Sequence, residues 1–295
     1  TGETKHYDAL AVANGHHWTP RIPEYPRHFD GAQLHSHQYR TPFEPVNCIG
    51  KRVLVVGMGN SAMDIASELS QRPMADKLFV STRRGVWIFP KYYQGQPLDK
   101  NPAPAWMPKG LRQWLGARMV KKLVGKMSDY GLPEPEIGPF ESHGTVSGEF
   151  LVRAGSGDIN MKPAVERLDG DGVIFTDGSR EKIDVIVWAT GYDISFPFFD
   201  NPAFTADSDN RPPPLFKRIM KPGVPDLFYM GLAQPLPTLV NFAEQQSKLV
   251  AAYLAGKYAP PSDDEMRRII AADEDYYTGQ YYAARRHTIQ LDFDH

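Results

Sequence analysis

Residues 53–69 constrain the fold of this chain more than any other stretch. Four apolar residues that favour β-structure run into the turn GMGNSA at 57–62, and an amphipathic helical pattern follows at once. A strand, a tight glycine turn and a helix in this order are typical of a dinucleotide-binding βαβ unit. The unpaired N–H groups at the start of such a helix face a phosphate anion. The stretch therefore predicts a nucleotide site; the alternative is a structural strand–turn–helix without a ligand.

Three small residues of this turn have separate expected tasks. Gly57 permits the sharp turn, and Gly59 has no Cβ, so that a pyrophosphate can approach the backbone. Ala62 is small enough for the helix to pack close to the strand.

The next predicted strand, residues 77–84, indicates which dinucleotide binds. It ends in two hydroxyl and two guanidinium side chains, Ser81, Thr82, Arg83 and Arg84. An NAD enzyme places an acidic residue at this strand end to accept from the ribose 2′-hydroxyl, whereas Asp76 lies at the opposite end. Guanidinium and hydroxyl groups suit a 2′-phosphate through charge-assisted hydrogen bonds. The pattern favours NADP(H) over NAD(H); a solvated basic strand end is the alternative.

One short pattern occurs twice, at residues 8–15 and 184–191. Each copy has an Asp, an apolar run and a Gly seven residues after the Asp, and a Pro-rich loop follows. We expect a buried parallel strand in both places, with its ligand-facing end at the Gly. The repeat predicts two nucleotide-binding lobes, and a coincidence between two buried strands is the alternative.

Residues 86–143 depart from a plain nucleotide-binding domain. A Pro-rich loop precedes an apolar stripe that repeats every four residues, formed by Leu111, Leu115, Met119 and Leu123. The spacing predicts a helix, and its many Lys and Arg residues make that helix basic. We expect the stripe to pack on its own domain; contact with a membrane surface or a partner is the alternative.

The rest of the chain alternates short predicted elements. Residues 149–176 read as short strands separated by Gly- and Asp-rich turns. A strand at 226–232 is followed by a helix at about 239–254, and residues 263–286 form a polar helical segment.

Composition excludes several classes of function. A net charge of −2 gives no reason to expect nucleic acid, and no apolar run reaches the 18 residues of a membrane-spanning helix. The single cysteine, Cys48, forms no disulfide within the chain, fits a reducing compartment and is expected to serve in packing. His35 and His37 lack further ligands at a recognisable spacing, so we expect no metal site.

With these residues in hand, the chain resembles a class B flavin-containing monooxygenase. Residues 29–39 match the fingerprint FxGxxxHxxx(Y/F), and residues 189–192 match the ATGY linker between the two lobes of that family. The turn at 57–62 and the strand end at 81–84 match its NADP motifs. Tyr39 closes the fingerprint where Baeyer–Villiger enzymes usually have Trp, which favours the N/S-oxygenating branch.

The resemblance implies an α/β fold of two Rossmann-like lobes, with an NADP lobe inserted in an FAD lobe. Residues 1–40 and 189–295 would belong to the FAD lobe, and residues 41–188 would form the NADP lobe with the 86–143 insertion. The GxGxxG unit that binds FAD at the start of the family is absent from this sequence. The expectation is a fragment, one piece of a split protein, or a sequence that lacks its first segment.

In this family NADPH reduces FAD, and reduced FAD reacts with O₂ to a C4a-hydroperoxyflavin that passes one oxygen to an amine or a sulfide. The resemblance assigns NADP to Gly57, Gly59, Asn60, Ser61, Ala62, Ser81, Thr82, Arg83 and Arg84. Asn60 is the one residue to which it gives a catalytic role, because with Ser61 it would hold NADP near the flavin. The FAD side would be lined by Asn14, Gly15, Thr190 and Gly191, with Gln234 and Thr238 near the isoalloxazine.

Three alternatives remain beside this reading. A Baeyer–Villiger monooxygenase is weakened by Tyr39, and a non-catalytic NADP-binding module gains from the missing FAD motif. A flavoprotein pyridine-nucleotide oxidoreductase is the third, without its disulfide subtype because one cysteine cannot form a pair. We also expect a cytoplasmic protein that associates as a homo-oligomer. The 86–143 loop contains no pattern from which the substrate could be predicted.

Overall fold

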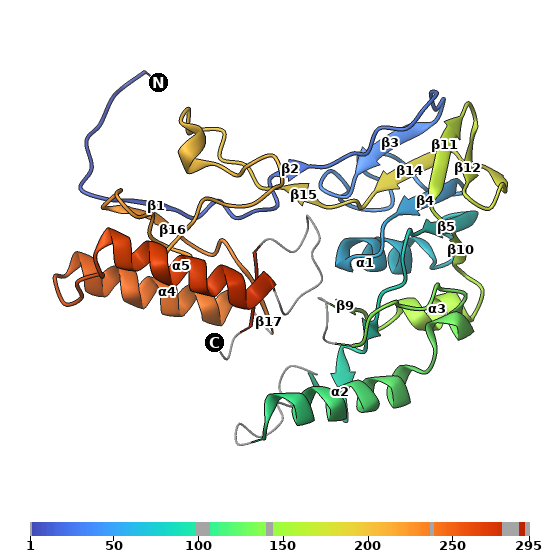
Figure 1. Ribbon diagram of the computed structural model, residues 1–295. Helices are drawn as coiled ribbons and strands as arrows, with labels where there is room; N and C mark the ends of the chain where they lie inside the picture. The colour runs from blue at the N-terminus through green and yellow to red at the C-terminus, as the bar shows by residue number, and fades with distance from the viewer. Residues whose placement is uncertain (1, 98–106, 140–143, 237–238, 279–288, 293–295) are drawn as a thin grey trace. The chain divides into compact units, whose positions relative to one another are not determined.

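The computed structural model describes residues 2–97, 107–139, 144–236, 239–278 and 289–292 of the 295-residue chain (Figure 1). Its backbone contacts divide the chain into two compact units. The first unit contains residues 1–19 and 192–295, and the second contains residues 20–191. The chain thus enters the second unit once and returns from it once.

A five-stranded parallel sheet is the centre of the second unit. Its order is β10-β5-β4-β14-β3. The strands are β3 (Ala32–His35), β4 (Arg52–Val56), β5 (Lys77–Ser81), β10 (Asn160–Lys162) and β14 (Val185–Trp188). From β4 the chain moves outward to β5 and β10, then returns to β14 on the other side of β4. The carboxyl ends of β4 and β14 therefore flank the switch point at which such sheets bind ligands.

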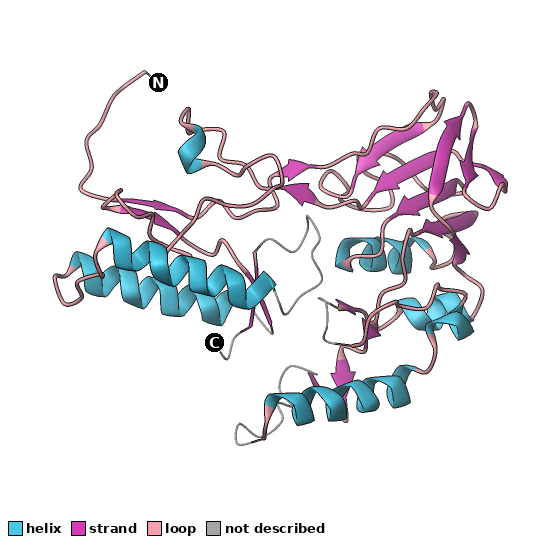
Figure 2. Ribbon diagram, in the orientation of Figure 1, coloured by secondary structure: helices cyan, strands magenta, loops and turns pink. Residues whose placement is uncertain are grey.

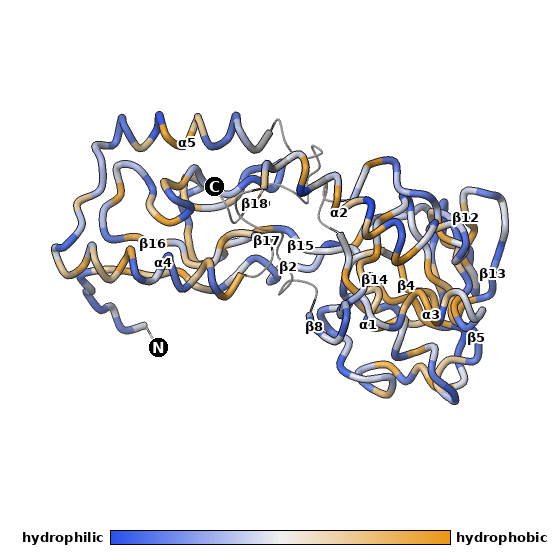
Figure 3. Tube along the Cα trace, turned by 90° about the horizontal axis from the view of Figure 1, so that it is seen from below, coloured by the Kyte–Doolittle hydropathy of each residue, from blue (hydrophilic) through white to orange (hydrophobic). Residues whose placement is uncertain are grey.

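The sheet is covered on both faces, as the alternation of its buried side chains requires (Figure 2). Val53 and Val55 of β4 belong to one core cluster, together with α1 (Asn60–Leu69). Leu54 and Val56 belong to a second cluster on the other face, against an antiparallel three-stranded sheet. That sheet consists of β11 (Val165–Asp169), β12 (Gly172–Phe175) and β13 (Arg180–Lys182). Hydrophobic residues accordingly concentrate around β4 and β14 (Figure 3).

The second unit also carries the segment that departs from a plain nucleotide-binding fold. Its elements are β6 (Ile88–Phe89), β7 (Tyr92–Tyr93), β8 (Gln96–Pro97), α2 (Lys109–Val124), a 3₁₀ turn at Met127–Tyr130, β9 (Thr145–Val146) and α3 (Phe150–Gly155). β6 and β9 pair in parallel, and β7 and β8 form a hairpin. The predicted basic helix is therefore present.

The face by which α2 packs differs from the predicted stripe. Val120 and Val124 are buried in the core cluster, whereas Leu111, Leu115 and Leu123 are 42–45% exposed. The helix lies against β6, and the face that meets this strand is the one that carries the two valines. The expectation that the leucine stripe packs on its own domain is therefore wrong.

A second correction concerns the start of the region predicted as short strands. Residues Phe150–Gly155 form α3, with Phe150 and Ala154 buried one helical turn apart. That spacing places both on one face toward the core. The strands that follow within this region, β10, β11 and β12, agree with the prediction.

The first unit contains short sheets and two long helices. Its elements are β1 (Leu10–Val12), β15 (Tyr192–Asp193), a 3₁₀ turn (Pro202–Phe204), β16 (Leu227–Tyr229), β17 (Gln234–Leu236), α4 (Leu239–Leu254), α5 (Asp263–Thr278) and β18 (Gln290–Asp292). β1 pairs in parallel with β16, and β17 with β18. β15 pairs with β2 (Thr19–Pro20), at the two points where the chain passes between the units. Among the described helices, none combines the length and apolarity needed to cross a membrane.

β1 is parallel, as the repeated pattern predicts, but it is not a buried strand. Leu10 is 50% exposed and Val12 alone is buried. Its sheet contains just two strands among the described residues, so one edge of β1 and most of its surface remain uncovered. The second copy of the pattern, β14, is buried throughout because β3 and β4 flank it.

Candidate functional site

The turn after β4 is closed by the approach of two backbone segments. Gly57 has a φ of +134°, which side-chain-bearing residues rarely adopt. A Cβ at this position would lie 2.3 Å from the carbonyl oxygen of Ala189, which follows β14. Glycine is therefore required at the switch point of the sheet for both space and conformation.

The next glycine opens the turn toward solvent. Gly59 is the N-cap of α1 in an extended conformation, and no side chain caps the helix. No heavy atom lies within 4 Å of the position of a Cβ at Gly59, whereas Ala62 is fully buried against the sheet. The first amides of a helix have no partner within the helix, so this end offers donors and the helix dipole to an anion. Ser61 is exposed in the same first turn.

Asn60 is held by a strand that sequence reasoning did not connect with the turn. Its Oδ1 accepts a hydrogen bond of 2.9 Å from the Val146 N–H. One residue earlier, the buried hydroxyl of Thr145 donates to the carbonyl oxygen of Met58 at 2.8 Å. No local sequence signal reveals these contacts, because they join positions 86 and 87 residues apart.

The strand end after β5 presents its two arginines, while its two hydroxyls are used within the protein. Ser81 is 1% exposed and donates to the carbonyl oxygen of Pro163 at 2.6 Å. The Thr82 hydroxyl donates to the carbonyl oxygen of Arg84 at 2.7 Å. Arg83 and Arg84 are exposed. The structure therefore gives the hydroxyls a supporting task and leaves the guanidinium groups at the surface.

An aromatic pair lies beside Arg83. The Tyr25 ring stacks on Trp188, with 5.6 Å between centroids and 17° between planes. Burial raises the pKa of Tyr25, and the positive charge of nearby Arg83 partly offsets that rise. The Trp188 indole N–H donates to Gln33 at 3.0 Å, and this bond fixes the orientation of the Trp188 ring. Sequence reasoning missed Tyr25 because its loop shows no motif.

The segment after β14 is braced by reciprocal contacts with Arg21. The Thr190 hydroxyl donates to the carbonyl oxygen of Arg21, whose guanidinium returns a bond of 3.1 Å to the Thr190 carbonyl. The Arg21 N–H donates to Gly191 O at 3.0 Å, and Gly191 has a φ of +85°. Both predicted residues thus shape the backbone at the carboxyl end of β14.

The remaining predicted residues belong to the first unit. Gly15 has a φ of +71° after β1, and the Asn14 amide donates to the Ser195 carbonyl at 3.5 Å. Gln234 lies in β17, where its N–H donates to the Ile289 carbonyl at 2.7 Å. Thr238 lies outside the described residues. The sheet of the second unit therefore brings together residues 57–62 and 81–84. Asn14, Gly15 and Gln234 of the first unit form a separate set.

The fingerprint at residues 29–39 performs structural work. A Cβ on Gly31 would lie 2.5 Å from the carbonyl oxygen of Asp184, and Phe29 packs on the second core cluster. The Tyr39 hydroxyl donates to Glu68 of α1 at 2.9 Å. These residues join β3 and its loop to β14 and α1.

Of the titratable candidates outside the turn, His35 and Cys48 are buried, whereas His37 is exposed. His35 is 1% exposed, its Nδ1 accepts the His37 N–H at 3.1 Å, and burial lowers its pKa. The described residues contain no group of three or more His, Cys, Asp or Glu that could hold a metal ion. Cys48 is fully buried, and burial raises the pKa of its thiol, which keeps it neutral.

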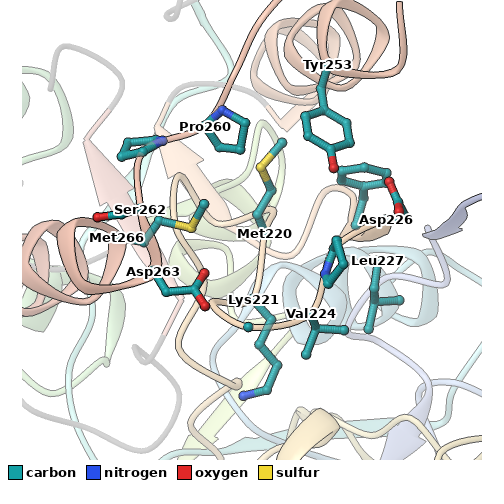
Figure 4. Close-up of a pocket in the computed structure, with 14 residues that line it drawn as sticks. Met220, Lys221, Val224, Asp226, Leu227, Tyr253, Pro260, Ser262, Asp263 and Met266 are labelled. Carbon is teal, nitrogen blue, oxygen red and sulfur yellow. The ribbon is translucent and has the colours of Figure 1, made fainter. Parts of the chain in front are cut away.

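The first unit contains a pocket of about 370 Å³ beside the start of β16 (Figure 4). Met220, Val224 and Met266 supply apolar walls, and Lys221 and Asp263 lie at its margin. Burial and a hydrogen bond to Asp226 raise the pKa of Tyr253 in this wall. No residue of the predicted nucleotide site lines this pocket. The pocket lies at the amino end of β16, whereas ligands of such sheets bind at the carboxyl ends of the strands.

Comparison with known proteins gives one consistent result. The sequence profile FMO-like, described as "Flavin-binding monooxygenase-like", matches residues 2–295. Flavin-containing monooxygenase 5 of Rattus norvegicus is 32% identical over 301 residues, which are 97% of this chain and 55% of that protein. Dimethylaniline monooxygenase [N-oxide-forming] 2 of Rattus norvegicus is 35% identical over 280 residues, 90% of this chain and 51% of that protein.

Solved structures share the fold. S-allyl-L-cysteine S-oxygenase from Allium sativum aligns with a TM-score of 0.61 and 24% identity over 96% of this chain and 50% of its own. Cyclohexanone monooxygenase from Rhodococcus sp. Phi1, bound to NADP⁺, aligns with a TM-score of 0.64 and 14% identity. The alignment covers 88% of this chain and 64% of that chain. The chain spans about half the length of the curated relatives it matches.

Proposed function

This chain belongs to the flavin-binding monooxygenase-like family, and on that premise we propose an NADPH- and FAD-dependent monooxygenase. The reaction inserts one oxygen atom of O₂ into a soft nucleophile, an amine nitrogen or a sulfide sulfur. The observation that carries the proposal is the open glycine turn at the carboxyl edge of the five-stranded sheet, with two exposed arginines at the next strand end. The matched relatives are about twice as long as this chain, so the activity is proposed for the whole protein and not for this chain alone.

The second unit fits NADP. The uncapped start of α1 and the open space at Gly59 suit its pyrophosphate, and Arg83 with Arg84 suits its 2′-phosphate. Asn60 and Ser61 border the same anion site from the first turn of α1. NADPH supplies a hydride when bound, and the chemistry of oxygen activation belongs to the flavin.

The first unit fits FAD only in part. Asn14, Gly15 and Gln234 lie there, with Thr190 and Gly191 at the end of β14, and we assign them with Thr238 to the flavin side. The described residues of this unit contain no glycine turn that leads from a strand directly into a helix N-terminus, as FAD phosphates require. The described residues of this unit therefore do not fit the phosphates of FAD.

The lobes follow from this assignment. The NADP lobe contains residues 41–188 with the 86–143 insertion. Residues 1–19 and 189–295 contribute to the FAD lobe. Residues 20–40 join the NADP lobe, since β3 pairs with β14 in its sheet.

Location and assembly complete the proposal. A chain with one cysteine forms no disulfide within itself, which supports the reducing cytoplasm, and cell fractionation tests this location. The exposed apolar residues Leu111, Trp114 and Leu115 of α2 support self-association, which light scattering of the purified protein tests.

The test of activity uses the full-length protein. Its flavin spectrum, NADPH oxidation and oxygenated product are measured with a tertiary amine and a thioether. An N-oxide or a sulfoxide formed in proportion to NADPH supports the proposal. An ester formed from a cyclic ketone indicates a Baeyer–Villiger enzyme, and a colourless protein that binds NADP⁺ indicates a binding module.

A further inference from the structure

Two hydrogen bonds tie β9 to the glycine turn. The Thr145 hydroxyl donates to the carbonyl oxygen of Met58 at 2.8 Å, and the Val146 N–H donates to Asn60 Oδ1 at 2.9 Å. Thr145 is 5% exposed and Met58 is 6% exposed, so water cannot readily replace the first bond. A buried hydrogen bond of this kind is costly to leave unmade.

The first bond fixes the direction of a donor in the turn. The carbonyl of Met58 and the N–H of Gly59 share one trans peptide plane and point in opposite directions. A carbonyl held by Thr145 therefore turns the Gly59 N–H away from β9. The second bond holds the first residue of α1, Asn60, to the same strand. Together they set the orientation of the amides that would meet a pyrophosphate.

β9 is itself held by β6, the first strand of the inserted segment. The Thr145 N–H donates to Trp87 O and the Ser147 N–H donates to Phe89 O, each at 3.0 Å. Gly144 lies so close to the Phe89 ring that a Cβ there would be 1.6 Å from Cε2. α2 packs on β6 as well. The inserted segment is thus connected to the turn at residues 57–62 through the two-residue strand β9.

We propose that Thr145 is a positioning residue for the pyrophosphate of NADPH, and that the insertion controls nucleotide affinity through it. The proposal rests on the proposed function, because the ligand of the turn is the dinucleotide. Thr145 acts through the Met58–Gly59 peptide and needs no contact with the nucleotide.

The experiment compares nucleotide affinities in the full-length flavin-loaded protein. Thr145→Val keeps the shape and removes the donor, Thr145→Ser keeps the donor, and Thr176→Val changes an exposed threonine of the same unit as a matched control. We expect Thr145→Val to raise the Kd for NADP⁺ at least tenfold and the KM for NADPH similarly, with kcat changed less than twofold. Thr145→Ser stays within threefold of the wild type, and Thr176→Val is unchanged.

A second probe separates positioning from general damage. 2′-AMP carries the 2′-phosphate but no pyrophosphate, so its Kd should be the same in Thr145→Val and the wild type. An unchanged Kd for NADP⁺ in Thr145→Val overturns the proposal, and so does an equal loss of affinity for NADP⁺ and 2′-AMP.

Hydrogen exchange makes the test independent of the nucleotide. Without ligand, the amides of residues 57–62 should exchange faster in Thr145→Val than in Thr176→Val. Wild-type protein that binds neither NADP⁺ nor 2′-AMP refutes the proposed function, while unaltered exchange refutes the anchoring by Thr145. Where Thr145→Val does not fold, Thr145→Ala removes the same donor with a smaller side chain, and a Kd for NADP⁺ raised less than threefold counts against the proposal.

Discussion

A Cβ atom on Gly57 would lie 2.3 Å from the carbonyl oxygen of Ala189. The glycine turn after β4 and the ATGY segment after β14 are therefore in direct contact, although they lie far apart in the sequence. Two motifs that a sequence comparison treats separately form one structural junction at the switch point of the sheet. Each therefore limits the substitutions that the other tolerates.

Gly57→Ala should destabilise the fold. The added methyl meets a backbone oxygen, and the φ of +134° adds conformational strain. We expect the free energy of unfolding to fall by about 3 kcal/mol, on the order of other strained backbone sites. Urea denaturation monitored by circular dichroism measures it; a loss below about 1 kcal/mol would contradict the close contact.

Gly59→Ala should have the opposite profile. Its φ of −83° suits alanine, and the space around a Cβ is open, so the free energy of unfolding should change little. The methyl would occupy the space we assign to the pyrophosphate, so the Kd for NADP⁺ should rise at least tenfold. Calorimetric titration measures the affinity. Normal affinity in this variant would place the nucleotide elsewhere.

Arg83→Ala should separate the two nicotinamide cofactors. A charge-assisted hydrogen bond contributes about 1.5–3 kcal/mol, which corresponds to roughly a 10- to 150-fold higher KM for NADPH. The KM for NADH should change less than twofold, because NADH has no 2′-phosphate. Lys122→Ala, on the exposed surface of α2, is the control. Equal losses with both cofactors would refute the assignment of the 2′-phosphate.

The packing of α2 is tested by a pair of truncations. Val120→Ala removes buried methyl groups and should lower the free energy of unfolding by about 1–2.5 kcal/mol. Leu115→Ala removes more atoms, but its side chain is 42% exposed, so we expect a change below about 0.5 kcal/mol. Thermal unfolding of both variants measures the two losses. A larger loss for Leu115→Ala than for Val120→Ala would show that the leucine stripe is the packed face.

Stability should depend on pH through the loop after β1. Burial and the neighbouring His17, whose ring centroid lies 4.2 Å away, lower the pKa of His16 to about 4. The unfolded chain takes up this proton near pH 6.5 and the folded chain near 4, so the stability present above pH 6.5 decreases as the pH falls between these values. The slope contributed by His16 is at most about 1.4 kcal/mol per pH unit. His16→Gln should flatten the profile between pH 6.5 and 4.5, and an unchanged profile would show that His16 is not the group that titrates.

Local patterns predicted the elements whose signals are local. The strand–turn–helix at residues 53–69, the strand ending at Ser81 and the helices α2 and α4 follow from runs and periodicities within one segment. The same holds for the turn conformation of Gly57. Their agreement with the structure reflects chemistry that each short segment carries by itself.

What could not be predicted at β1, α2, Ser81 and Thr145 has one physical cause, which is dependence on a distant partner. The burial of β1 depends on which strands flank it, and the packed face of α2 depends on the position of β6. The hydroxyl of Ser81 donates a hydrogen bond to the carbonyl oxygen of Pro163, and that of Thr145 donates to the carbonyl oxygen of Met58. None of these partners is visible from the neighbouring sequence, so no periodicity could identify them.

The order of the sheet has a consequence for biosynthesis. β3 and β4 are made early, yet no hydrogen bonds join them, because β14 lies between them and is made more than a hundred residues later. On the ribosome, the backbone groups of β3 and β4 that pair with β14 therefore stay unpaired until residues 185–188 have emerged. Pairing over such long separations is slow and exposes strand edges to aggregation. A nascent chain arrested before β14 should accordingly bind chaperones, and release should coincide with the synthesis of this one strand.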